Sequence, residues 1–213
     1  MKTLLDLNLQ GLTFRGCADE EFLQQELFIQ TLNKIDTESP LMIELGSCDA
    51  YYSIVFNKFF RNKNVKNYCV EISEEFQEIG KNNALKSDSK NMIFITAGIG
   101  DLNELSSHVI CDNIDIVEKY TFSDLLNINN IKYVDMLHMD IQGTEVSVLR
   151  DIIDNKLFTK IKYAFISTHP SDGKFGPSHN ECLNLIKDIN TEIYYNDEFN
   201  GGVGDGLIVL EFK

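Results

Sequence analysis

A change of hydrophobic period within residues 134–153 is the feature that most constrains the fold. Val134–Met139 is an apolar run of the kind found in buried parallel strands. From Thr144 onward, apolar residues recur at helical spacing. Gly143 lies at the transition, where a residue without a Cβ atom frees the backbone. This pattern predicts a parallel α/β sheet with Asp140 at the carboxyl end of a strand, where such sheets bind ligands.

Strand-like and helical segments alternate through most of the chain, which is typical of such a sheet. The expected strands are residues 41–45, 68–72, 92–97, 134–139, 163–168, 192–195 and 207–212. The expected helices are residues 50–60, 73–85 with Ser73 as N-cap, 121–126, a helix from residue 145, and 178–189. Residues 114–117 also have the composition of a strand. The last two strands flank the polar, Gly-rich residues 196–206, which predicts a terminal hairpin.

The length of 213 residues suits one sizeable domain. Residues 1–39 differ from the rest, because an alternating segment there precedes an amphipathic helix. We expect them to form an N-terminal arm that covers the core. Residues 40–213 are then expected to form the ligand-binding domain.

The net charge is −14, from 33 acidic and 19 basic residues. This balance argues against nucleic acid and anionic membranes as partners, because both require clustered Lys and Arg. No apolar run reaches the length of a membrane span, and Asp6 and Asn8 interrupt any secretory signal. The cysteines lack a Cys-x-x-Cys pair, which predicts reduced thiols in a cytoplasmic protein. They are Cys17, Cys48, Cys69, Cys111 and Cys182.

A glycine turn follows the first expected strand and precedes a helix, an arrangement that lets a nucleotide approach the backbone. The dinucleotide fingerprint fails, because Cys48 replaces its second glycine, and no P-loop is present. A turn for a nucleoside without pyrophosphate remains, with Glu44 beside it. A carboxylate there suits a positively charged ligand such as S-adenosylmethionine. A glycine needed only for a tight turn, here Gly46, stays open as the alternative.

The second expected strand places Glu71 at its carboxyl end. A carboxylate at this position commonly accepts hydrogen bonds from both ribose hydroxyls of a nucleoside. A solvated charge at the sheet edge is the alternative for Glu71 alone. Its combination with Glu44 and Gly46 favours a cofactor site.

With these residues in hand, the chain resembles the FkbM-like family of S-adenosylmethionine-dependent methyltransferases. The segments that carry the resemblance are residues 43–53, 70–71, 120–126 and 135–149. The last is the most specific, because the family pattern there is Asp, an apolar residue, an acid, Gly, a small residue and Glu. The resemblance implies a Rossmann-like methyltransferase fold, with a mostly parallel seven-stranded sheet and a C-terminal antiparallel hairpin.

The resemblance also implies S-adenosylmethionine as the cofactor, bound at the carboxyl ends of the strands. The expected cofactor-binding residues are Glu44, Gly46, Ser47, Cys48, Glu71, Ile72, Asp101 and Asp140. The chain departs from the family pattern at three positions. Ala50 replaces a second glycine, Gln142 replaces an acid, and His138 stands where lysine is common.

The implied reaction is methyl transfer, most often to a hydroxyl oxygen, which requires positioning and removal of the acceptor's proton. The expected catalytic residues are His169, Asp140 and His138. His169 is the preferred general base, because imidazole titrates near neutral pH; a role only in ending a strand is its alternative. His138 has the alternative of a core histidine. Asp140 and His169 could also hold a divalent metal ion, although the sequence offers only these two ligands.

The expected function is O-methylation of a small molecule or carbohydrate, such as a capsule or glycan precursor. A protein with this fold that binds the cofactor without transfer, as a scaffold or partner, is the alternative from another class. An NAD-dependent oxidoreductase is disfavoured by Cys48. Self-association stays open.

Overall fold

The computed structural model describes residues 2–7, 9–12, 14, 22–101, 118–168, 178–202 and 205–213. The strands in this part of the chain are β1 (Leu41–Leu45), β2 (Lys66–Glu71), β3 (Met92–Ile99), β4 (Glu118–Tyr120), β5 (Val134–Met139), β6 (Ile161–Thr168), β7 (Thr191–Gly202) and β8 (Asp205–Phe212). The helices are α1 (Phe22–Leu32), α2 (Tyr51–Phe59), α3 (Glu74–Lys86), α4 (Phe122–Ile128), α5 (Glu145–Asp154) and α6 (His179–Ile186). Short 3-10 turns lie at η1 (Leu4–Asp6) and η3 (Leu157–Lys160).

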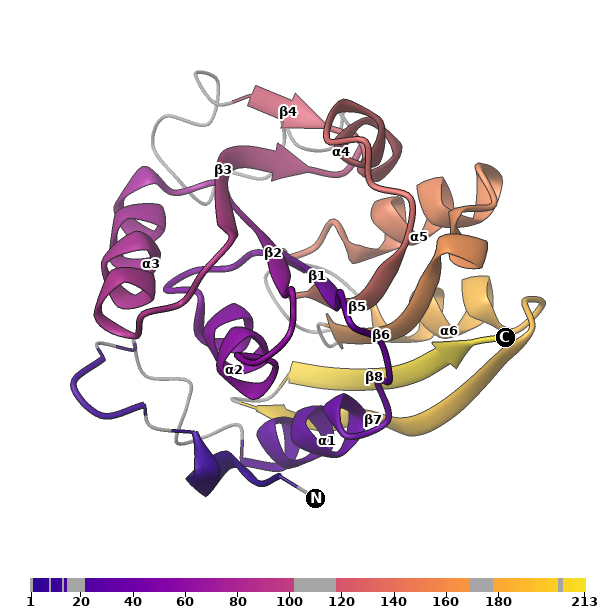
Figure 1. Ribbon diagram of the computed structural model, residues 1–213. Helices are drawn as coiled ribbons and strands as arrows, with labels where there is room; N and C mark the ends of the chain where they lie inside the picture. The colour runs from indigo at the N-terminus through magenta and orange to yellow at the C-terminus, as the bar shows by residue number, and fades with distance from the viewer. Residues whose placement is uncertain are drawn as a thin grey trace.

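The strands form one sheet in the order β4-β3-β2-β1-β5-β6-β8-β7, with helices on both faces (Figure 1). Strands β1 to β6 pair in parallel, and β8 pairs antiparallel with both β6 and β7. The chain builds outward from β1 to β4 and then returns to place β5 beside β1. The strand order therefore reverses between β1 and β5, and sheets of this class bind ligands at such a switch point.

The predicted mostly parallel α/β sheet with a terminal hairpin is confirmed, but the sheet has eight strands where seven were predicted. The additional strand is β4, which pairs with the end of β3 from Ala97 to Ile99. Its three residues are too short a segment to show an alternating pattern. The strand predicted at residues 114–117 lies outside the described residues.

The expected strands at residues 192–195 and 207–212 are too short, because β7 runs to Gly202 and β8 begins at Asp205. Asn196 and Asp197 pair with Ile208 and Leu207 of β8. Backbone hydrogen bonds of the ladder do not depend on side-chain polarity, and β7 is an edge strand that tolerates polar residues. The register shift between Asp197 and Gly202 accommodates the irregular part of this strand.

Two clusters of buried apolar side chains cover the two faces of the sheet. Leu45 and Leu137 point into a cluster with side chains of α4, α5 and α6. Met42 and Met136, on the same strands, point into a cluster with side chains of α1 and α2. Alternate residues of β1 and β5 therefore meet helices on opposite faces, which explains why these strands are apolar throughout.

The N-terminal helix α1 belongs to the second cluster, beside α2. The Phe28 side chain is fully buried, and its ring meets those of Tyr52 and Phe165 edge-on at centroid distances of 5.0 and 5.3 Å. Figure 1 shows α1 beside β7 and β8 on the α2 side of the sheet. The domain boundary near residue 39 stays a prediction, and α1 lies against the core as a cover would.

None of the described helices is both long and apolar enough to cross a membrane. The cysteines that the structure describes, Cys48, Cys69 and Cys182, are not joined in disulfides.

Replacing Phe28 with Ala tests whether α1 is part of the cooperative core. We expect a loss of about 3–5 kcal/mol in the free energy of unfolding, because the substitution empties a fully buried aromatic site. Urea denaturation measures this loss. Phe22→Ala on the same helix is the matched control, since that ring is 70% exposed and its loss should change stability by at most about 0.5 kcal/mol. Equal effects of the two substitutions would show that α1 is not anchored in the core.

Candidate functional site

The turn after β1 is held against the turn after β5. The backbone amide of Asp140 donates to the Leu45 carbonyl at 2.9 Å, and the amide of Gly46 donates to the Val70 carbonyl at 2.9 Å. Gly46 has a φ of +73°, and a Cβ atom there would lie 1.8 Å from the carbonyl oxygen of Asp140. Only glycine fits this contact, which joins the carboxyl ends of β1, β2 and β5 at the switch point.

The rest of this turn has an unusual backbone. Cys48 and Ala50 both adopt positive φ angles, 45° and 63°, although neither is glycine. Such conformations persist where the surrounding structure over-determines them. The family's second glycine is therefore replaced by an alanine that still takes the left-handed conformation.

Glu71 supplies part of that surrounding structure. One oxygen of its carboxylate accepts from the Cys48 amide at 2.8 Å and the other from the Ser73 amide at 2.9 Å. Ser73 is the predicted N-cap of α3, and its hydroxyl accepts from the Phe76 amide. Burial raises the pKa of Glu71, against the lowering effect of these amides. Glu71 therefore couples the turn after β1 to the start of α3.

Ser47 lies in the same turn and is 2% exposed. Its hydroxyl has no hydrogen-bond partner among the described residues. Buried hydroxyls in folded proteins are normally bonded. A polar group of a ligand at this turn would satisfy it.

Glu44 lies under the start of α2. Its carboxylate accepts from the Ser53 amide at 3.0 Å, in the first turn of a helix whose N-cap residue, Ala50, offers no side-chain acceptor. Burial, with a smaller contribution from the nearby Asp49, raises the pKa of Glu44 to about 8, against the lowering effect of its hydrogen bonds with Ser53. The structure thus gives Glu44 an internal partner, while the predicted contact with the cofactor stays a prediction.

The turn after β5 is held by a buried acid of its own. Glu145 is fully buried and accepts from the amides of Ile141 at 3.3 Å and Gly143 at 3.1 Å. The Gln142 amide group donates to the Asp140 carboxylate at 3.1 Å. Gln142, which replaces the family's acid, therefore supplies a donor beside Asp140, where an acid would repel it.

His138 is buried on the face of β5 that α1 and α2 cover. Its ring stacks on Tyr52 at 4.2 Å, and its Nε2 lies 3.0 Å from Nε2 of Gln24 on α1. Burial lowers the pKa of His138 to about 3, so the ring is neutral at physiological pH. This environment is that of a core histidine, the alternative reading of this residue.

The end of β3 is tied to the start of α5. The Asp101 amide donates to the Ser147 hydroxyl at 3.1 Å, and the Thr144 hydroxyl donates to the Ile99 carbonyl at 2.9 Å. These bonds place Asp101 at the same edge of the sheet as Glu71. Ile72, half-buried, connects Glu71 to Ser73.

His169 lies outside the described residues, so its predicted roles as base and metal ligand stay predictions. Asp140 is at the predicted strand end. In the part of the chain that the structure describes, no three His, Cys, Asp or Glu side chains are grouped so as to hold a metal ion.

Sequence reasoning missed a buried polar network at the end of β6. The Thr168 hydroxyl lies 2.6 Å from Nδ1 of His179, whose Nε2 lies 2.8 Å from the Asn196 side-chain oxygen. A Cβ atom on Gly206 would lie 2.5 Å from the Thr168 hydroxyl. These residues come from four separate segments, so no local pattern in the sequence reveals the network.

The sequence matches the family described as methyltransferase FkbM domain over residues 36–193, which include the turns after β1, β2 and β5. The chain belongs to this family. The predicted family resemblance is confirmed. No curated protein matches the sequence.

Solved structures show that this FkbM-domain chain has the Rossmann-like methyltransferase fold. Methyltransferase FkbM from Methylobacillus flagellatus KT aligns with a TM-score of 0.54 and 15% identity, covering 83% of this chain but only 44% of that protein. Precorrin-6y C5,15-methyltransferase from Geobacter metallireducens GS-15 gives 0.54 and 15%, covering 93% of each chain. Aeropyrum pernix fibrillarin, solved with natively bound S-adenosyl-L-methionine, gives 0.53 and 11%, covering 82% of this chain and 67% of that one.

Replacing Gly46 with Ala tests the contact between the two turns. We expect a loss of about 3 kcal/mol or more in the free energy of unfolding, because the new Cβ atom meets a backbone oxygen that has no room to move. Gly11→Ala is the matched control, since Gly11 has a similar φ of +79° and open space around its Cβ position. It should lose only about 1–2 kcal/mol, the cost of the left-handed conformation. A Gly46→Ala loss no larger than the control's would contradict the close approach.

Replacing Glu44 with Gln tests the raised pKa. Between about pH 4.5 and about pH 8 the carboxyl group of Glu44 keeps its proton in the folded state and releases it in the unfolded state. The free energy of unfolding therefore falls as pH rises through this window. The loss is at most about 1.4 kcal/mol per pH unit. The glutamine of the variant cannot titrate. We therefore expect the variant to become more stable relative to the natural protein as pH rises through the window. Urea unfolding at several pH values measures the difference, and a difference independent of pH would refute the assignment.

Proposed function

We propose that the chain is an S-adenosylmethionine-dependent O-methyltransferase that acts on a hydroxyl of a small molecule or carbohydrate. Family membership and fold support methyl transfer. The observation that carries the cofactor assignment is the bond between Glu71 and the Cys48 amide. It sets a buried carboxylate beside a glycine turn and a helix N-terminus, the combination that nucleoside sites use.

The residues of this turn fit the cofactor. The Glu71 carboxylate accepts from the amides of Cys48, Ser73 and Ile72, and its two oxygens together retain acceptor capacity for a ribose hydroxyl. The Ser47 hydroxyl supplies a further polar group without a described partner. We therefore assign ribose binding to Glu71, a contact beside it to Ile72, and contacts along the turn after β1 to Gly46, Ser47 and Cys48. Bound S-adenosylmethionine would supply an electrophilic methyl group on its sulfonium.

The chain's own contribution to the reaction is to position the acceptor and remove its proton. Asp140 is proposed to orient the acceptor hydroxyl, since its backbone is pinned by Leu45 and its carboxylate is held by Gln142. His169 is proposed as the general base. A divalent ion on Asp140 and His169 is the alternative for this step.

The net charge of −14 supports a neutral or cationic acceptor over nucleic acid. Sugar hydroxyls of capsule or glycan precursors in the cytoplasm meet this condition. A methyl-transfer screen of such precursors, with and without a chelator, would identify the acceptor and decide between base and metal.

One observation favours a second candidate, a partner protein that binds the cofactor without transferring its methyl group. His138 stands where the family commonly has lysine, and it is buried and neutral. Binding of S-adenosylmethionine with no transfer to any pooled precursor would select this candidate.

Replacing Glu71 with Ala should weaken S-adenosylmethionine binding by about 10- to 100-fold or more, because two hydrogen bonds to a charged acceptor are lost. Isothermal titration calorimetry measures the affinity. Glu74→Ala, at an exposed acid one helical residue beyond the cap, is the matched control and should bind as the natural protein does. Glu71→Gln, which keeps an acceptor for the turn, should fall between them. Unchanged affinity in Glu71→Ala would overturn the ribose assignment.

A further inference from the structure

A basic hollow of about 600 Å³ lies at the amino-terminal ends of β2 and β3, the edge of the sheet opposite the carboxyl ends. It is bounded by η1, the end of α2 and the end of α3. The cations that line the hollow are Lys2, Lys58, Arg61, Lys63 and Lys90. Nothing in the proposed methyl transfer uses this edge.

The charge of this hollow opposes that of the molecule. Acidic residues outnumber basic ones by 33 to 19 in the whole chain, but among the described residues that line the hollow the only acids are Asp6 and Asp88. Residues 58–66 contain four basic residues and no acid. A local reversal of sign in a strongly acidic chain concentrates a positive potential at one place, which attracts anions.

The cations are partly positioned and not neutralised. Lys63 Nζ donates to the Thr37 carbonyl at 2.6 Å, and Lys2 Nζ donates to the Phe59 carbonyl. Lys58, Arg61 and Lys90 make no side-chain hydrogen bond or ion pair within the described part of the chain. The hollow therefore combines two lysines held in place by backbone carbonyls with three cationic side chains that could donate hydrogen bonds to an anion.

The lowered pKa values of two lysines in the hollow agree with this geometry. Burial lowers the pKa of Lys58 and of Lys2, and the Arg61 guanidinium lowers each pKa further by repulsion. The carboxylate of Asp88 offsets the effect at Lys58, and that of Asp6 offsets it at Lys2. The remaining like-charge repulsion is relieved when a negative group enters.

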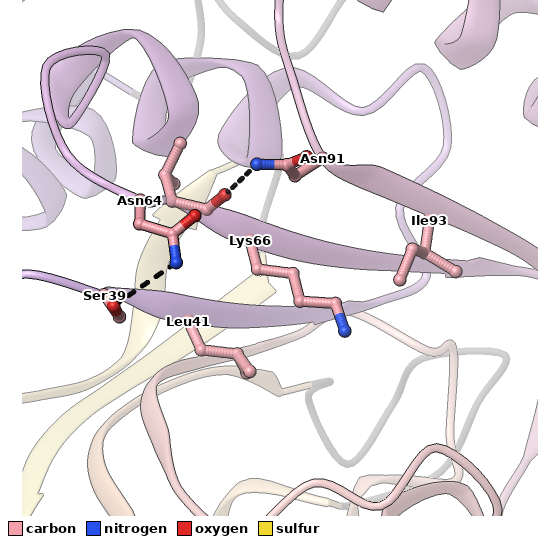
Figure 2. A pocket seen from close by; sticks show the side chains of 7 residues that line it. Ser39, Leu41, Asn64, Lys66, Asn91 and Ile93 are labelled. Atoms are coloured by element: carbon pink, nitrogen blue, oxygen red, sulfur yellow. Dashed lines mark hydrogen bonds between the residues drawn. The ribbon is translucent and has the colours of Figure 1, made fainter.

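We propose that the basic hollow binds a small phosphate-bearing anion of the diphosphate class. Its volume is in the range of small-molecule sites, and Lys and Arg together are the residues that hold phosphate. The acidic remainder of the surface opposes a long nucleic-acid strand, which would have to cross it. An adjoining hollow of about 410 Å³ shares Val65 and Asn91 with the first (Figure 2).

Figure 2 shows Lys66 extending across this second hollow, between Leu41 and Ile93. The Asn91 amide group donates to the Val65 carbonyl at 3.1 Å and forms the wall that the two hollows share. A further cation therefore lies beside the basic hollow, next to apolar side chains. This arrangement suits a diphosphate that carries an organic substituent.

Calorimetric titration of the full chain with inorganic pyrophosphate at low ionic strength tests the proposal. We expect saturable binding to one site, weakened by roughly tenfold or more in the double variant Lys58→Gln, Arg61→Gln. The matched control is Lys132→Gln, Lys187→Gln, which removes the same charge from exposed positions outside the hollow and should bind as the natural protein does. If the double variant does not fold, the exposed single variant Lys90→Gln replaces it, with a smaller expected loss.

Absence of saturable pyrophosphate binding would overturn the proposal, as would equal weakening in the control. A single-stranded RNA that binds this site while pyrophosphate does not would assign it to a macromolecule instead. Affinity for S-adenosylmethionine should be unchanged in the double variant, so the outcome is independent of the proposed methyl transfer.

Discussion

The close approach of two backbone turns, one after β1 and one after β5, is the constraint on which the rest of the site depends. Gly46 lies where a Cβ atom would collide with the Asp140 carbonyl, and the Asp140 amide is bonded to Leu45. The strand order reverses between β1 and β5. The chain therefore leaves these strands toward opposite faces of the sheet, into α2 after β1 and into α5 after β5. Glu71 at the end of β2, the proposed ribose ligand, and Asp140 after β5, proposed to orient the acceptor, are therefore brought to one place by a contact that involves no side chain.

Buried carboxylates stabilise this arrangement in a common way. Glu44, Glu71 and Glu145 each accept hydrogen bonds from backbone amides of a turn or helix start. Burial disfavours the charged form and raises the pKa of Glu44 and of Glu71, and the backbone amides offset part of this effect. The acids that mark the site in the sequence thus shape the turns first, and the proposed ligand contacts depend on the turns they shape.

The sequence predicted the parts of the fold that have a period or a cap. β1 and β5 have the predicted bounds, and Ser73 caps α3 as expected. It did not predict β4, which is too short to show a period, or the extension of β7 through polar residues, which depends on pairing with β8. Contacts between distant segments were also beyond it. The close approach of Gly46 to Asp140 and the network around His179 arise only when separate turns and strands meet.

The two edges of the sheet have opposite electrostatic character, and this separates the two proposals. The carboxyl edge presents buried acids and a glycine turn, whereas the amino edge presents the cations of the basic hollow. An acidic chain that keeps five cations at one hollow sustains their mutual repulsion in the folded state. The proposed anion site lies at the amino-terminal ends of β2 and β3, and the proposed nucleoside site lies at the carboxyl end of β2. The same strands therefore connect the two sites.

A crystal structure of the protein with S-adenosylhomocysteine would show directly whether the joined turns and Glu71 hold the nucleoside. We expect the ribose hydroxyls within hydrogen-bonding distance of the Glu71 carboxylate, and the nucleoside along the turn from Gly46 to Ala50. A ligand bound elsewhere, or a ribose without contact to Glu71, would contradict it.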